Sequence, residues 1–78
     1  MLEEIIKKFP DDEFLTADGF TEAIIGVEWP SMRIVYSMAE CIKILTVDMS
    51  VEDALDHYYY NVSGAYVGEK TPIWREDY

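Results

Sequence analysis

The stretch AIIGVEWPSMRIVYSMAE, residues 23–40, carries most of the information about fold class. Residues 23–29 are short, apolar and rich in β-branched side chains, which indicates a buried strand. A Pro-Ser pair breaks this strand and residues 33–36 (RIVY) resume one, so the two segments predict a hairpin. Residues 37–40 (SMAE) form a capping-box pattern, which predicts the start of a helix. Because a lone hairpin is marginally stable, we expect helices to cover it.

Helical patterns follow the hairpin. The helix after Ser37 has an apolar face made by Met38, Cys41, Ile42 and Leu45. Ser50 is a good N-cap for another helix. The apolar stripe of that helix would consist of Ala54, Leu55, Tyr58, Val62, Ala65 and Tyr66. We expect this helix to fray near Gly64 and to end by Gly68. Residues 70–74 should then be extended, as an edge strand or a strap, because Pro72 cannot donate to a central sheet ladder.

Two smaller signals complete the pattern. Residues 2–9 predict a short N-terminal helix that Pro10 stops, followed by an acidic loop at residues 11–13 with Phe14 and Leu15 tucked beneath it. Gly26 inside the first strand predicts a bulge or a close backbone approach.

The order of elements is helix, strand, strand, helix, helix, strand, which predicts an α+β fold. We expect a small antiparallel sheet, made of the hairpin and a candidate third edge strand at residues 73–74, covered by two to three helices. With 78 residues the chain makes one domain, 1–78. Within it, residues 1–17 form the N-terminal helix and acidic loop, and residues 75–78 form a polar tail.

The charge of the chain is strongly negative, with 16 Asp and Glu against 6 Lys and Arg and a net charge of −10. This balance argues against general binding of phosphate backbones, which depends on Lys and Arg. The acids form two blocks: residues 1–22 contain seven acids and two lysines, and residues 48–63 contain four acids and no base. Residues 23–47 between them are neutral.

Several classes of protein are disfavoured. One cysteine excludes an intramolecular disulfide framework, and the apolar content of 50% is too high for a chain that lacks a core. No apolar run approaches the roughly 20 residues that span a bilayer. The N-terminus is too charged for a secretory signal, so we expect a cytoplasmic location.

Three blocks of sequence carry a resemblance: residues 18–28 (DGFTEAIIGVE), 33–45 (RIVYSMAECIKIL) and 49–74 (MSVEDALDHYYYNVSGAYVGEKTPIW). Together they resemble a family of small acidic proteins of unknown function encoded by bacteriophages and prophages. The resemblance covers about residues 18–74 and implies a phage origin, with the host cytoplasm as location. It gives no catalytic residue. The residues that carry its most specific pattern are Asn61, Gly64, Ala65, Tyr66, Val67, Gly68 and Glu69.

The acidic face of the last predicted helix is one candidate partner-binding site. Its carboxylates are Glu52, Asp53 and Asp56, and Tyr60 falls among them on the arc that should face solvent. An exposed aromatic ring among carboxylates suits a basic partner. The competing interpretation is a solvated helix face whose acids favour the helix N-terminus.

Residues 61–69 are a second candidate site. Their two glycines permit close approach of another backbone, and Tyr66 offers a flat amphipathic contact. The competing interpretation is a helix C-terminus that passes over the sheet, with Gly68 as its left-handed cap.

No motif indicates catalysis, a metal or a cofactor. His57 has no second histidine to join it, and Cys41 lies on an apolar helix face where a buried structural thiol is expected. The acid pair Asp11 and Asp12 is read as loop carboxylates rather than as a catalytic pair.

The function that these patterns favour is a non-enzymatic interaction protein that binds and modulates a host protein with a basic surface. One form of this is nucleic-acid mimicry, in which Glu52–Asp56 and the loop with Asp11 and Asp12 together occupy a groove meant for DNA. We expect neither nucleic acid nor a membrane as a direct partner. The alternative is a homo-oligomer with a structural or ligand-binding role, because the chain has many large aromatic side chains for its size.

Overall fold

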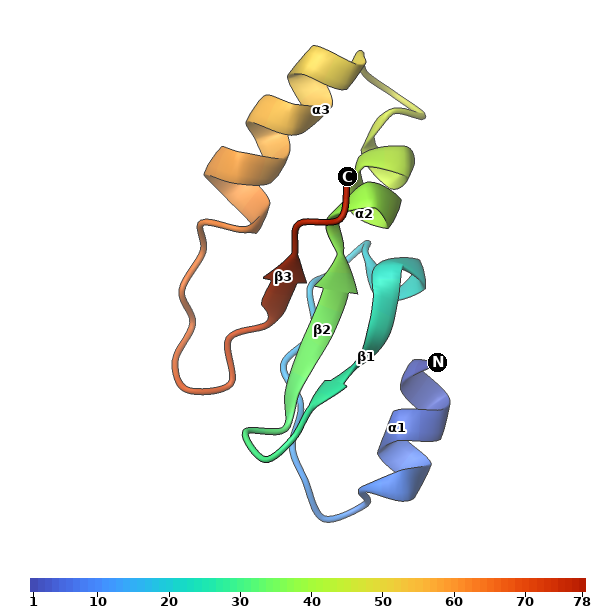
Figure 1. Cartoon of the computed structure of the whole chain (residues 1–78), viewed down its shortest axis with the longest axis vertical. Helices are drawn as coiled ribbons and strands as arrows, with labels where there is room; N and C mark the ends of the chain where they lie inside the picture. Colours follow the sequence, from blue (N-terminus) through green and yellow to red (C-terminus); the bar gives the residue numbers. More distant parts are fainter.

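A β-hairpin lies at the centre of the molecule. In the computed structural model, which describes residues 1–78, β1 (Ile24–Glu28) pairs antiparallel with β2 (Arg33–Ser37) (Figure 1). The register of this pair shifts between Ile24 and Gly26, so Ile25 is the extra residue of a β-bulge. The predicted hairpin is therefore confirmed, and the bulge lies beside Gly26, at Ile25.

The third strand joins the sheet in the opposite direction to the predicted one. β3 (Ile73–Arg75) lies at the edge of the sheet, in the order β1-β2-β3, and pairs parallel with β2. The reason is the path of the chain. After α3 the segment of residues 63–72 continues toward the β1–β2 turn and reverses there, so β3 runs in the same direction as β2 (Figure 1). The fold is α+β as predicted, but its small sheet is mixed rather than antiparallel.

Three helices surround the sheet: α1 (Leu2–Lys8), α2 (Met38–Leu45) and α3 (Val51–His57). The two predicted caps are present, since the Ser37 hydroxyl accepts a hydrogen bond from the Glu40 amide and the Ser50 hydroxyl accepts one from the Asp53 amide, both at 3.2 Å. A short 3₁₀ turn, η1 (Thr21–Ala23), leads into β1.

The last helix is shorter than its apolar periodicity predicts. It widens into a π-helical turn, η2 (Tyr58–Val62), which ends with the Ser63 amide donating to the Tyr58 carbonyl at 2.8 Å. Beyond this turn the chain is no longer helical, so Ala65 and Tyr66 leave the predicted stripe and are exposed. Gly68 has a φ of 115°, but it lies in the following loop and does not cap the helix.

The core lies on one face of the sheet. The sheet contributes Ile24, Ile34 and Tyr36, and the helices contribute mainly Ile5, Met38, Cys41, Ile42, Ala54, Tyr58 and Val62. Val35 and Ile73, which alternate with Tyr36 and Trp74 along paired strands, are half-buried and stand outside this cluster. The body is elongated, with extents of 39 × 22 × 19 Å.

Candidate functional site

A groove runs between the loop of residues 13–20 and the segment of residues 61–74. Its deeper part is a pocket of about 360 Å³, whose apolar lining includes Leu15, Phe20, Val62, Ala65, Pro72 and Trp74. A second hollow shares Leu15 and Val67 with this pocket and continues past Glu13 and Glu69. These two hollows together are called the groove below.

Aromatic side chains support the floor of the groove. The Trp74 ring stacks on Tyr36, with ring centroids 4.6 Å apart and planes at 21°. Phe20 and Tyr58 each meet Trp74 edge to face, at 6.4 and 6.0 Å. Trp74 therefore lies at the junction between the groove and the core, where its ring is held from three sides.

One wall of the groove is fixed by a single buried tyrosine. The Tyr36 hydroxyl accepts a hydrogen bond from the Ala17 amide at 2.7 Å. Burial raises the pKa of Tyr36 above its ordinary value of 10.0, so this hydroxyl is neutral at physiological pH. The loop of residues 13–20 is thereby tied to the centre of β2.

The opposite wall is held by hydrogen bonds around Thr71. The Thr71 hydroxyl accepts from the Val67 amide at 2.9 Å and donates to the Gly68 carbonyl at 2.6 Å. Arg33 Nε donates to the Thr71 carbonyl at 2.6 Å, and Lys70 Nζ donates to the Ser31 carbonyl at 3.0 Å. Two of the six basic side chains are thus engaged by backbone carbonyls.

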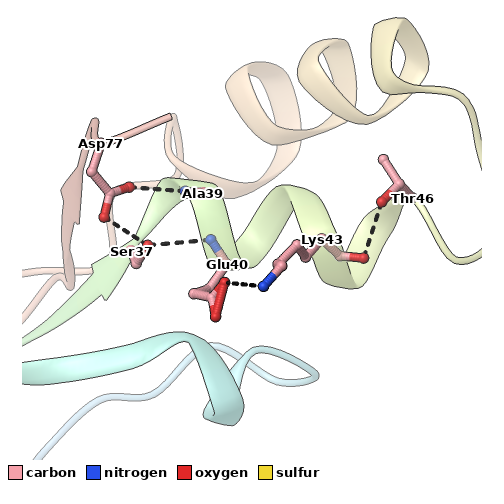
Figure 2. Close-up of polar contacts among 6 residues, drawn as sticks. All are labelled: Ser37, Ala39, Glu40, Lys43, Thr46 and Asp77. Atoms are coloured by element: carbon pink, nitrogen blue, oxygen red, sulfur yellow. Dashed lines mark hydrogen bonds and ion pairs between the residues drawn. The ribbon is translucent and has the colours of Figure 1, made fainter.

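The C-terminal tail closes the fold beside β3. The two carboxylate oxygens of Asp77 accept hydrogen bonds from the Ala39 amide at 2.9 Å and the Ser37 hydroxyl at 2.7 Å (Figure 2). The bond from the Ala39 amide has the largest effect and that from Ser37 the next, and together they hold the pKa of the Asp77 carboxyl below its ordinary value. Residues 75–78 were expected to be only a polar tail, but Asp77 caps the N-terminus of α2.

The acidic residues predicted as one site are separated in the structure. Glu52, Asp53 and Asp56 lie on the exposed side of α3, and Tyr60 on η2 is 83% exposed. The loop with Asp11 and Asp12 follows α1 at the opposite end of the long axis (Figure 1). The α3 carboxylates and the loop with Asp11 and Asp12 therefore do not form one continuous acidic face.

Of the pattern residues, Asn61, Ala65 and Val67 line the deeper pocket and Glu69 lines the adjoining hollow. Tyr66 is 79% exposed and lines neither hollow. Gly64 lies where a Cβ atom would come within 2.9 Å of the Tyr59 carbonyl oxygen, so close backbone approach explains this glycine.

The groove is not apparent from the sequence because its two walls come from distant segments. Phe14 and Leu15 were expected beneath the acidic loop. Phe14 is half-buried, but Leu15 remains 41% exposed and lines both hollows. The only signal in the sequence was a pair of apolar residues beside acids, which does not by itself distinguish a groove from a core contact.

Cys41 and His57 differ in their surroundings. Cys41 is fully buried, and its burial, with smaller effects from the charges of Asp77 and Glu40, raises the pKa of the thiol to about 11. The expectation of a buried structural thiol is confirmed. His57 is half-buried, with its Nδ1 atom 3.4 Å from the Asn61 amide nitrogen. No group of three or more His, Cys, Asp or Glu side chains is placed to hold a metal ion.

Comparisons of the chain with known protein families, with curated proteins and with solved structures gave no match. The resemblance to phage proteins therefore rests on the sequence motifs alone. None of the helices has both the length and the apolar character needed to cross a bilayer.

Proposed function

We propose that the protein is a non-enzymatic interaction protein that binds a partner with a basic surface and modulates it. The observation that carries this proposal is the exposure of the carboxylates, because every Asp and Glu except Glu40 is exposed. Only Glu4 and Glu40 form ion pairs, and the charges of Arg33 and Lys70 point into backbone carbonyls. The surface therefore keeps a large unneutralised negative charge, which accelerates encounter with a basic partner.

The contact surface that we propose is the exposed side of α3 with its continuation into η2. It combines Glu52, Asp53 and Asp56 with the exposed ring of Tyr60. Carboxylates one helical turn apart, such as Glu52 and Asp56, are spaced by about 5–6 Å, and Tyr is among the residue types enriched in binding hot spots.

Nucleic-acid mimicry is proposed only in a local form. A B-DNA segment as long as this protein, 39 Å, would carry about 23 phosphates at one charge per ~1.7 Å. The chain carries 16 acids and 6 bases, and the loop with Asp11 and Asp12 lies at the opposite end of the molecule from α3 (Figure 1). Mimicry would therefore involve the α3 end alone, rather than a groove filled along the whole length.

Self-assembly is the second candidate function. It is favoured by three aromatic side chains that are at least three-quarters exposed, Trp29, Tyr60 and Tyr66. The net charge of −10 opposes it, because like charges repel at low ionic strength. Sedimentation at micromolar concentration separates the two candidates, since a monomer at both low and high salt excludes self-assembly.

Affinity capture from a producing host tests the proposed function. Tagged protein should retain a basic partner at low salt and release it as salt rises. The double variant Glu52→Gln/Asp56→Asn should retain less of this partner, while Asp11→Asn/Asp12→Asn, which removes the same charge at the other end, should retain it. Capture that is indifferent to salt and to both variants would contradict the proposal.

A further inference from the structure

The groove between residues 13–20 and 61–74 is separate from the contact surface proposed on α3, since none of the α3 carboxylates lines it. Its deeper pocket, at about 360 Å³, is more than twice the ~150 Å³ of an engineered apolar cavity that binds benzene. Such a volume accommodates one large aromatic side chain or two aliphatic ones. Phe20 and Trp74 line it, and Leu15 and Val67 at its mouth are exposed.

The charges along the groove are almost all negative. Asp18 lines the deeper pocket, Glu13 and Glu69 line the adjoining hollow, and all three are exposed. Lys70 is the only base among the lining residues, and its Nζ donates to two backbone carbonyls of the β1–β2 turn. A ligand in the groove therefore meets an apolar floor with carboxylates along its edge.

This charge pattern decides which occupant the groove fits. A second copy of the chain could offer the exposed Trp29, but Glu28 precedes it and the copy carries a charge of −10. An apolar side chain flanked by cationic groups satisfies both the floor and the edge. Charge complementarity thus favours a basic segment over self-association.

Both walls of the groove are held before any ligand binds. The Ala17 amide bonds to the buried Tyr36 hydroxyl, and Thr71 fixes the loop that carries Val67. A preorganised site does not have to order its own loops when the ligand binds, which favours recognition of a short segment.

We propose that the groove binds a linear segment of the partner protein in which one large apolar side chain is flanked by lysine or arginine. The apolar side chain enters the pocket over Trp74, and the cationic groups contact Asp18 and Glu69. The inference rests on the proposed function, because it assigns to the same basic partner a second contact with the chain.

Titration of ¹⁵N-labelled protein with short peptides tests the inference. The probe is the capped peptide Lys-Lys-Phe-Lys-Lys, and the controls are Lys-Lys-Ala-Lys-Lys and Glu-Glu-Phe-Glu-Glu. The two indole N–H signals report directly, since Trp74 lines the pocket and Trp29 lines neither hollow. We expect the probe to shift the Trp74 signal saturably, with Kd at least tenfold weaker for either control peptide, a factor that corresponds to about 1.4 kcal/mol.

Two pairs of variants locate the binding. Ala65→Phe, which fills the pocket from an exposed position, should weaken the probe at least tenfold, whereas Val47→Phe on an exposed site outside the groove should not. Asp18→Asn/Glu69→Gln should weaken the probe more than Glu52→Gln/Asp56→Asn, although both pairs remove the same charge. The amide spectra of the unbound variants show whether each one keeps the fold.

The outcomes separate the two proposals. Saturable shifts at α3 and Tyr60 without any shift at Trp74 overturn the groove and leave the proposed function standing. If neither surface shows saturable shifts up to ~1 mM peptide, the proposed binding in the groove is wrong. The proposed function is overturned by a separate result, the absence of salt-sensitive capture of a partner from the host. Equal binding of the glutamate peptide also overturns the groove inference.

Discussion

Two buried tyrosines with opposite hydrogen-bonding states offer a matched test of the structure. Tyr36 and Tyr58 are both 0% exposed, and Phe replaces either of them with the loss of one oxygen atom. The Tyr36 hydroxyl accepts from the Ala17 amide at 2.7 Å, whereas the buried Tyr58 hydroxyl has no hydrogen-bond partner. The same chemical change should therefore alter the free energy of unfolding in opposite directions.

The expected magnitudes follow from that difference. Tyr36→Phe leaves the partly buried Ala17 amide without its acceptor, which costs about 1–3 kcal/mol. Tyr58→Phe removes a buried hydroxyl that makes no hydrogen bond, so it should be neutral or stabilise the fold by up to about 1–2 kcal/mol. A domain of this size shifts its Tm by about 4–8 °C per kcal/mol, so the two variants should melt at least several degrees apart.

Thermal and urea unfolding of both variants at neutral pH provide the measurement. Wild-type protein and the double variant complete a cycle, and near-additivity is the expected result unless the two hydroxyls couple through Trp74, which both rings contact. Amide exchange at Ala17 should accelerate in Tyr36→Phe alone. If Tyr58→Phe destabilises the protein as much as Tyr36→Phe, the assignment of satisfied and unsatisfied hydroxyls is wrong.

Three further changes test other parts of the fold. Asp77→Asn should lower stability at neutral pH, and its difference from wild type should shrink in acid, because a carboxylate with a lowered pKa stabilises the fold above the ordinary carboxyl pKa and loses this effect as pH falls through the folded pKa. Because the pKa of Cys41 is raised to about 11, its thiol should react slowly with disulfide reagents at mildly alkaline pH. Rapid labelling of the folded protein would contradict the burial of this thiol. The free energy of unfolding of the wild type should also fall as pH rises from the ordinary thiol pKa of 9.0 through 11, and it should fall less steeply in Cys41→Ala. Gly64→Ala should cost about 1–3 kcal/mol in urea unfolding, since its Cβ would meet a backbone oxygen at 2.9 Å, while Gly26→Ala, with nothing within 4 Å, should be tolerated.

Local signals in the sequence predicted local structure well. The hairpin, a bulge beside Gly26 and the N-caps at Ser37 and Ser50 depend on residues within a few positions of one another, and all four are present. The α+β class follows from the order of these elements.

Features that depend on distant residues were not predictable in the same way. The parallel direction of β3 depends on where the chain returns after η2, and periodicity carries no information about that path. The helical stripe was extended too far because apolar spacing continues through Ala65, while the π-helical turn and the close contact at Gly64 end the helix earlier. The groove requires both the 13–20 loop and the 61–74 segment, so no single stretch of sequence predicts it.

Three consecutive tyrosines show how the fold divides one chemical type among different roles. Tyr58 is fully buried against Trp74, Tyr59 is 46% exposed with its hydroxyl 3.9 Å from the Met38 sulfur, and Tyr60 is 83% exposed. Rotation around the helix accounts for the first two, since they fill the core and its border. It gives no packing reason for Tyr60, whose ring remains in solvent.

The positions of the basic side chains also bear on the proposed binding of a cationic partner. Lys70 lines the groove and donates to the Ser31 carbonyl, and Arg33 donates to the Thr71 carbonyl, so both bases hold the segment of residues 61–74 against the hairpin. These side chains therefore stabilise the loop that shapes the groove and leave its carboxylates unpaired. If these bases formed ion pairs with surface acids instead, the repulsion among the surface carboxylates would be smaller. A cationic partner that supplies the missing charge is the proposal that these exposed carboxylates support.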